Sequence, residues 1–267
     1  MARKKLERQL MSALPPERVT LSRPFANTGV DFAGPFELKT YSGRGCRIVK
    51  GYICLFVCFA TKAIHLEAVS DLSTPAFMAA LTRFISRRGC PNKIFSDNGR
   101  NFVGAAREIK ANFKRTVLEL KDKAISQYGQ QQLEWHFIPA AAPHMGGLWE
   151  AGVKSCKTHL KKIAGQIHYT YEEFSTMLAA IEACLNSRPL TPQSENIDDL
   201  TALTPGHFLI GSSLLSPAEP EEIPTKTSLL NRWRKLKVIQ QEFCRRWKSD
   251  YLKELHKGTN GNSHHKI

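Results

Sequence analysis

The strongest constraint on the fold is a series of short apolar segments that are separated by turn signals. Residues 30–36 alternate between two faces, so we predict a strand that carries Asp31 on the face opposite two large apolar residues. The nearly continuous apolar run 48–60 is typical of a strand that is buried on both faces. Residues 64–69 alternate again after a short break, which predicts a hairpin between the second and third strands.

Helices and shorter strands follow this hairpin. Ser73-Thr74-Pro75 is a helix start, because a capping hydroxyl precedes a proline in the first turn, and Gly89 marks the end of that helix. We predict strands at 93–96 and 133–138, with an amphipathic helix (109–124) between them.

Two further helices are predicted at 148–164 and 171–187, after a loop at 139–147. Three antiparallel strands followed by alternating helices and strands is the order of the ribonuclease H-like fold. The predicted fold class is therefore α/β, with a mixed five-stranded sheet flanked by helices. A long basic helix with an apolar stripe from Trp233 to Leu255 forms a C-terminal extension.

The composition divides the chain into five predicted parts. These are a basic leader or remnant, the ribonuclease H-like core, a Pro-rich linker, the long amphipathic basic helix and a disordered tail, at residues 1–26, 27–190, 191–227, 228–256 and 257–267.

The charge favours a polyanionic partner. The 267 residues carry a formal net charge of +14, and nucleic acid is the first candidate, ahead of an acidic membrane surface. No apolar run is long enough to span a bilayer, and the first residues lack the hydrophobic core of a secretory signal. The seven cysteines form no CxxC motif and mostly lie in apolar runs, which favours a reducing compartment; we expect the nucleus.

Three acidic residues lie where this fold could bring them together. Asp31 is on the first predicted strand, Asp97 follows the fourth, and Glu150 lies in the first turn of a helix. Clustered carboxylates repel unless a cation neutralises them, and all-oxygen ligands favour Mg²⁺ or Mn²⁺. Two such ions about 4 Å apart can promote phosphoryl transfer without a protein nucleophile. Taken singly, each acid has an ordinary alternative, as a satisfied buried group, a turn former or a residue favoured by the helix dipole.

A row of lysines is a second indication. Lys154, Lys157 and Lys161 share a helix face with Glu150, opposite an apolar stripe. Such a row suits a phosphate backbone, although simple pairing of glutamate with lysine on a solvated face explains it equally well. His144, in the preceding loop, is a further candidate for nucleic-acid binding. The sequence has no GxSxG, P-loop or HExxH motif, so neither another hydrolytic mechanism nor a nucleotide cofactor has support.

The segments around the three acids are GVDFAGPF (29–36), IFSDNGRNFVGAAREI (94–109) and PHMGGLWEAGVKSCK (143–157). They closely resemble the integrase region of BEL/Pao-type LTR retrotransposon polyproteins, as do LNSRPLTP (185–192) and LTPGHFLIG (203–211). The resemblance covers nearly the whole chain.

This resemblance implies a catalytic triad of Asp31, Asp97 and Glu150 that holds two Mg²⁺ or Mn²⁺ ions. It implies a polynucleotidyl transferase that trims the ends of element DNA and joins the new 3′-hydroxyl to a target duplex, as a homo-oligomer. Integrases usually have an N-terminal zinc domain, but no His or Cys precedes Asp31, so we expect that domain to be absent. We expect the same of the C-terminal β-barrel.

Other functions remain open on the sequence alone. The basic last helix favours a non-catalytic or domesticated DNA-binding remnant, and the strand order permits a nuclease that acts on RNA–DNA hybrids. The apolar stripe of the last helix also has two interpretations, as a face for assembly with another copy or as a surface that packs on the chain's own core.

Overall fold

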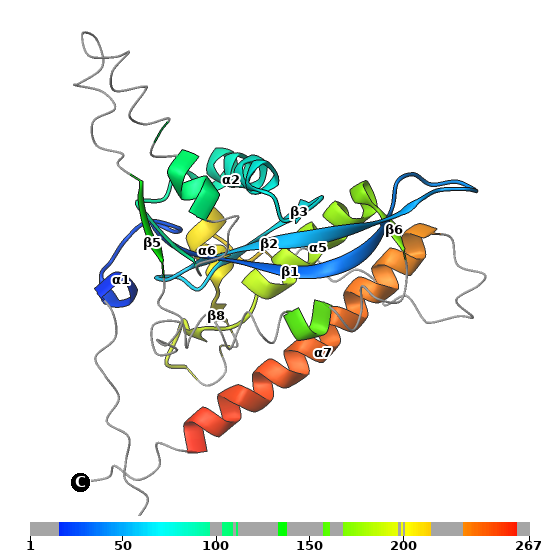
Figure 1. Cartoon of the computed structure of the whole chain (residues 1–267). Helices are drawn as coiled ribbons and strands as arrows, with labels where there is room; N and C mark the ends of the chain where they lie inside the picture. Colours follow the sequence, from blue (N-terminus) through cyan, green and yellow to red (C-terminus); the bar gives the residue numbers. More distant parts are fainter. Residues whose placement is uncertain are drawn as a thin grey trace, which may run out of the picture.

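The computed structural model describes residues 16–96, 103–108, 111, 133–137, 157–160, 168–196, 199, 201–214 and 232–260. The strands are β1 (Asn27–Lys39), β2 (Ile48–Cys58), β3 (Ile64–Val69), β4 (Lys93–Ser96), β5 (Glu134–Phe137), β6 (Tyr169–Thr170), β7 (Thr191–Pro192) and β8 (Ala202–Leu203). The helices are α1 (Pro16–Val19), α2 (Thr74–Arg88), α5 (Tyr171–Asn186), α6 (Pro205–Ile210) and α7 (Arg232–Asn260), and residues 103–108 and 157–160 are also helical (Figure 1).

The main sheet has the strand order β3-β2-β1-β4-β5. The first three strands of the chain are antiparallel neighbours, whereas β4 and β5 run parallel to β1. The two-residue strand β6 pairs with the carboxyl end of β1. This mixed sheet with flanking helices confirms the predicted α/β, ribonuclease H-like fold class, and the adjacency of the first and fourth strands follows from it.

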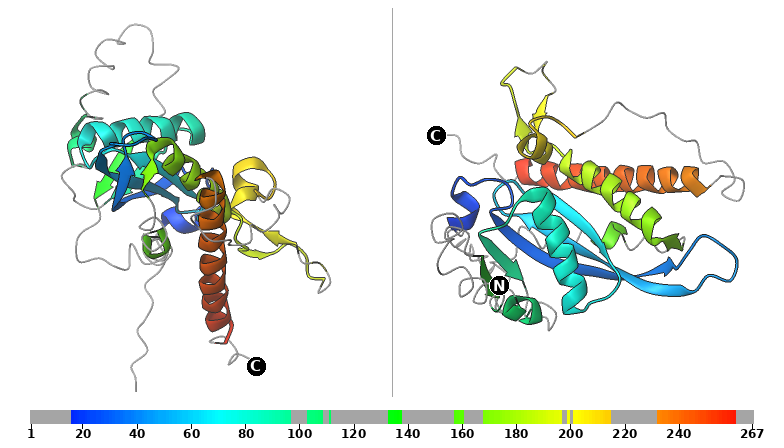
Figure 2. Two further views of the ribbon diagram at one scale, coloured as in Figure 1. Left: turned by 90° about the vertical axis from the view of Figure 1, so that its right-hand side faces the viewer. Right: turned by 90° about the horizontal axis from the view of Figure 1, so that it is seen from above.

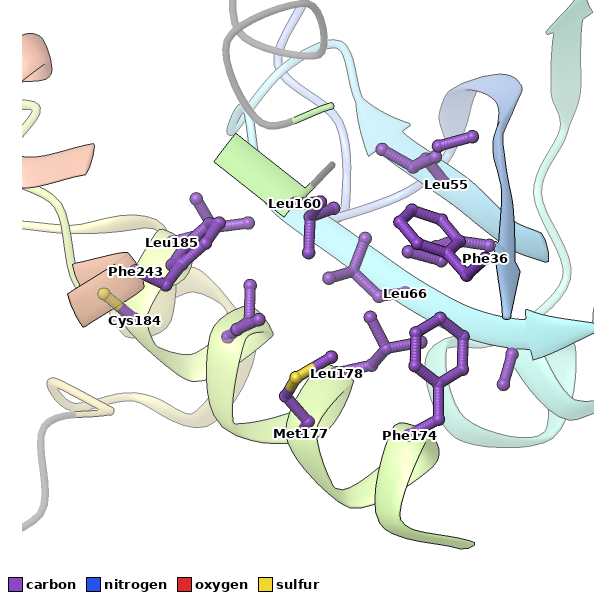
Figure 3. Packing of buried hydrophobic residues seen from close by; sticks show 14 of the residues in the cluster. Phe36, Leu55, Leu66, Leu160, Phe174, Met177, Leu178, Cys184, Leu185 and Phe243 are labelled. Atoms are coloured by element: carbon purple, nitrogen blue, oxygen red, sulfur yellow. The ribbon is translucent and has the colours of Figure 1, made fainter. Parts of the chain in front are cut away.

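Helices cover both faces of the sheet, as the two views of Figure 2 show. On one face, Phe77 and Phe84 of α2 pack in a cluster with Val30 and Phe56. On the other face, α5, α7 and Leu160 pack against residues of β1, β2 and β3 (Figure 3). Because successive strand residues point to opposite faces, β1 contributes to both cores.

Local sequence signals set the helix ends, and those of α2 are at the predicted residues. The Ser73 hydroxyl accepts a hydrogen bond from the backbone N–H of Ala76 at 3.3 Å, and α2 ends at Gly89, which has a φ of 84°. Helix α5 begins with a capping box, in which Thr170 and Glu173 each accept a hydrogen bond from the backbone N–H of the other.

The structure differs from the prediction of a plain linker at 191–227. The described part of this range contains the β7–β8 pair and helix α6. The α6 start has Pro205 in its first turn, and the helix ends at Gly211 in the left-handed conformation. These are the same signals that mark α2, but a helix of six residues is too short to show a helical period. Residues 215–231 lie outside the described part.

Two predicted boundaries also differ. Phe25 falls in the predicted leader (1–26), yet it is fully buried and its ring meets that of Phe84 edge-on, with centroids 5.3 Å apart. A single apolar residue shows no periodicity, so the sequence around Phe25 did not indicate that this side chain is buried. Helix α7 continues to Asn260, into the predicted disordered tail (257–267), because extending an existing helix is far easier than starting one.

The second strand is exposed over its first three residues and enters the core from Gly51 onward. The exposed residues Ile48, Val49 and Lys50 open β2 and pair with the end of β1, so this part of the hairpin extends past the core (Figure 1). The prediction of burial on both faces over 48–60 is wrong for these three residues, because a β-branched run at the end of a strand looks the same as one at its centre.

Candidate active site around Asp31

Asp31 lies near the middle of the sheet, on the central strand β1. It stands opposite Leu55 of β2, and the side chain is 31% exposed. Its Oδ1 accepts a hydrogen bond of 2.7 Å from the backbone N–H of Phe32. Three residues further on, Gly34 adopts a φ of 137° at an irregularity in the pairing, where an added Cβ would lie 2.8 Å from the Tyr52 ring. The strand therefore changes its pairing directly after the candidate site.

The other oxygen of Asp31 binds the ammonium group of Lys157. This ion pair joins β1 to the helical segment 157–160, and the two side chains are 31% and 25% exposed. In the same segment Leu160 is buried against the sheet and His159 contacts Asp250 of α7 at 3.1 Å. One face of this segment therefore enters the core while Lys157 lies against the carboxylate.

The carboxyl end of β4 lies beside the start of β1. Gly29 is level with Phe95 in the parallel register, and β4 ends at the buried Ser96, whose Oγ accepts a 2.9 Å hydrogen bond from the Trp135 indole. The other predicted site residues lie outside the described residues: Asp97, which follows Ser96 in the chain, and Glu150, Lys154, Lys161 and His144.

Within the described ranges, no group of three or more His, Cys, Asp or Glu side chains is arranged to hold a metal ion. Of the predicted ligands, these ranges contain Asp31. Its carboxylate supplies hard oxygen donors and is partly open to solvent, which suits Mg²⁺ or Mn²⁺. One of its oxygens already binds a cationic group, the Lys157 ammonium.

A second set of charges, which the sequence analysis did not identify, is centred on His65 of β3. This side chain is buried, with Nε2 3.0 Å from Glu67 and Nδ1 3.2 Å from Glu182 of α5. Burial alone would lower the pKa of His65, but the hydrogen bonds to the two carboxylates outweigh it, so the pKa is raised above its ordinary value. Burial would raise the pKa of each carboxyl group, yet the hydrogen bonds to His65 help to hold both below their ordinary value.

Arginines of α2 complete this charge network. Arg83 and Arg87 contact Glu67 at 2.6 and 3.0 Å, and Arg88 contacts Glu182. The network links α2, β3 and α5, so its role is to join elements of the fold. The sequence did contain a signal for this network. In β3 the polar residues His65 and Glu67 alternate with apolar residues, yet every residue of the strand is buried, so these two side chains need charged partners.

The strand order, the parallel β1–β4 pair and the helices on both faces define the class of protein, an α/β domain of the ribonuclease H-like fold. None of the helices in the described ranges is both long and apolar enough to cross a bilayer.

No protein-family model and no curated protein matches the chain. Among solved structures, the chain is similar to one in the simian T-cell lymphotropic virus intasome in complex with PP2A regulatory subunit B56 gamma, with 13% identity and a TM-score of 0.45 over 80% of this chain and 65% of that one. It is also similar to the catalytic core domain of BIV integrase, with 13% identity and a TM-score of 0.41 over 70% of this chain and 95% of that one.

Proposed function

We propose that the chain is a retroelement integrase core of the BEL/Pao type, which carries out metal-dependent 3′-end processing and DNA strand transfer. The observation that carries the proposal is the position of Asp31, a partly exposed carboxylate on the central strand next to the carboxyl end of β4. Asp97 is the residue after β4. If the register of Gly29 with Phe95 continued for two more residues, Asp97 would be level with Asp31.

The contact between Lys157 and Asp31 supports Glu150 as the third acid. Lys157 follows Glu150 by seven residues, about two helical turns, so the two share one face of the predicted helix. A helix that presents Lys157 to β1 is therefore oriented to present Glu150 on the same side. Lys154 and Lys161 belong to this face as well.

In this proposal Asp31, Asp97 and Glu150 hold two Mg²⁺ or Mn²⁺ ions. When bound, such ions activate an attacking oxygen and stabilise the leaving oxygen of a phosphodiester. The residues of the chain supply the ligand oxygens and the positive charge that holds the DNA backbone, with Lys154, Lys157, Lys161 and His144 as the contacts. We propose that the protein acts on element ends and target duplex in the nucleus, as a homo-oligomer that holds two DNA ends.

A DNA-binding remnant without catalysis is the second candidate, and the same ion pair favours it. The Lys157 ammonium binds one oxygen of Asp31 and so competes with a metal ion for this ligand. The net charge of +14 would support binding of DNA whether or not the acids act.

A disintegration assay separates the two candidates. A branched DNA that mimics the strand-transfer product is incubated with Mg²⁺ or Mn²⁺ and with the wild-type chain, Asp31→Asn or Glu150→Gln. Glu134→Gln is the matched control, since it removes a carboxylate that is 55% exposed from the edge strand β5, on the far side of β4 from Asp31. We expect resolution by the wild type and by the control, and loss of resolution in the two triad variants.

Full activity of Glu150→Gln would contradict the triad. If no variant and no metal gives resolution while the folded chain binds duplex DNA in a salt-sensitive manner, the remnant is the correct interpretation. Cleavage of an RNA–DNA hybrid in preference to duplex DNA would instead indicate a hybrid-specific nuclease.

A further inference from the structure

The β1–β2 hairpin ends in a basic arm, defined here as residues 39–50. The arm carries Lys39, Arg44, Arg47 and Lys50 and contains no acidic residue. From residue 40 onward every side chain is exposed except that of Cys46, which is half-buried. Four positive charges are thus concentrated on a short projection of the sheet.

Hydrogen bonds hold the arm in a defined shape. Lys39 pairs with Ile48 as the last cross-strand pair, and beyond it the backbone N–H of Thr40 donates to the Arg47 carbonyl at 3.1 Å. The Arg47 N–H donates in return to the Thr40 hydroxyl at 3.3 Å, and the Tyr41 hydroxyl donates to the carbonyl of Arg44 at 3.0 Å. The arm is therefore an ordered two-stranded ribbon with a closed tip.

Within the described residues the arm cations form no ion pair, and Glu37, the cross-strand partner of Lys50, binds His168 instead. The exposed arginines of α7 differ, because Arg245 and Arg246 both bind Glu242. Large apolar side chains are also exposed beside the arm cations: Tyr41, Ile48 and Val49 are 44–52% exposed. A surface that combines free positive charge with exposed aromatic and aliphatic groups is suited to a polyanion with an apolar interior.

We propose that the hairpin arm binds duplex DNA as a two-stranded ribbon in the major groove. The groove of B-form DNA is about 12 Å wide and admits such a ribbon, whereas the major groove of A-form RNA is too deep and narrow. In this arrangement Arg44, Arg47 and Lys50 bind phosphates, and the apolar side chains face base edges and sugars. Only the choice of DNA as the ligand rests on the proposed function. Binding by the arm requires neither the metal nor the triad.

The test is the salt dependence of binding to a duplex of 30 base pairs, measured by fluorescence anisotropy in EDTA. The arm variant is Arg44→Gln/Arg47→Gln/Lys50→Gln, and the control is Arg245→Gln/Lys248→Gln/Lys253→Gln on α7. Each removes three positive charges from exposed positions, so both have the same net charge. Each phosphate contact contributes about 0.9 to the slope of log K against log salt, so the arm variant should lose about 2.7. We expect a smaller loss in the control, where Arg245 and Lys253 are already paired with acids.

Equal slopes for the arm variant and the control would overturn the proposal, because binding would then depend on net charge alone. It would also be overturned if double-stranded RNA or phosphatidylserine vesicles bound the wild-type chain more tightly than DNA and lost that affinity in the arm variant.

A measurement on the wild-type chain does not depend on the folding of any variant. Duplex DNA should protect Cys46 of the arm from alkylation by iodoacetamide, while Cys90, half-buried at the end of α2, reacts at the same rate with and without DNA. Equal protection of both thiols, or of neither, would contradict the placement of DNA on the arm. Because these measurements use EDTA, failure in the disintegration assay would count against the catalytic proposal and leave the arm to be judged separately.

Discussion

Replacing Phe243 with alanine tests whether α7 is part of the folded core. Phe243 is fully buried and lies in one cluster with Leu185 of α5 and Leu160 of the segment 157–160 (Figure 3). Its ring also meets that of His159 edge-on, with centroids 6.2 Å apart. Elements from three parts of the chain therefore surround this ring.

The expected loss follows from that position. Truncation of a fully buried phenylalanine destabilises a protein by about 3–5 kcal/mol, and the loss is largest where the surrounding structure cannot collapse into the cavity. Since α5 and the segment 157–160 hold the walls of this cavity, we expect about 4 kcal/mol. That is roughly a thousandfold change in the folding equilibrium and a large part of the ~5–15 kcal/mol by which domains are usually stable.

The assay is urea unfolding, followed by circular dichroism at two protein concentrations tenfold apart. Phe208→Ala on α6 is the control, since Phe208 is 44% exposed and its truncation should lower the stability by less than about 1 kcal/mol. A loss below about 1 kcal/mol for Phe243→Ala would refute the packing argument. So would a loss that depends on protein concentration, because it would mean that a second copy covers α7.

Three further predictions concern the buried polar groups. Because the pKa of His65 is raised in the folded state, its contribution to stability is complete below the ordinary value of 6.5 and is lost as the pH rises through the folded pKa. The free energy of unfolding should fall by at most about 1.4 kcal/mol per pH unit in this window. A free energy of unfolding in urea that stays constant from pH 6 to 9 would contradict this. The pKa values of Glu67 and Glu182 are lowered, so their contribution should be present above the ordinary value of 4.5 and be lost as the pH falls through the folded values, which a titration from pH 6 to 3 would detect. Asn186→Ala should destabilise the fold by roughly 2–4 kcal/mol in urea unfolding, because it removes hydrogen bonds of 2.8 and 2.7 Å to the N–H and carbonyl of Ile64, and a loss below about 1 kcal/mol would argue against it.

The sequence predicts those elements of the fold that carry their own local signals. The bounds of β4 agree with the predicted strand 93–96, and α2 begins and ends at the predicted caps. The apolar alternation of β1 also placed Asp31 on the face that it occupies, since Ala33 enters one core and Val30 the other.

The remaining elements depend on contacts that no short segment encodes. Strand β6 has two residues and exists because it pairs with the end of β1. The charge network of His65 requires side chains of α2 and α5, which cover opposite faces of the sheet, to reach its edge strand β3, and a single strand pattern does not reveal this. The same holds for the ion pair of Asp31 with Lys157, whose partners are 126 residues apart in the chain.

Packing also decides between the two interpretations of the apolar stripe on the last helix. Leu236, Ile239, Phe243 and Trp247 are all buried in the cluster that contains α5, so within the described residues the stripe is covered by the chain itself. A homo-oligomer would therefore have to use another surface, and the outer side of α7 contributes positive charge.

Strand β1 connects the candidate active site with the hairpin arm, and this sets a length that can be tested. Lys50, the phosphate-binding arm cation nearest to Asp31, is level with Glu37, which is six residues from Asp31 on β1. At about 3.3 Å per residue this separation is about 20 Å, which corresponds to roughly six base pairs of DNA. If both proposals hold, the nearest contact of the arm with the duplex is about that far from the phosphate that reacts.

A series of branched substrates would measure this spacing, with one duplex arm shortened in steps from 20 to 4 base pairs. The arm variant should resolve long substrates more weakly than the α7 control, and the difference should disappear once the shortened duplex is below about six base pairs, because no DNA then reaches the arm. A difference that persists at four base pairs would mean that these cations act at the reacting phosphate, and the separation of roles along β1 would be wrong.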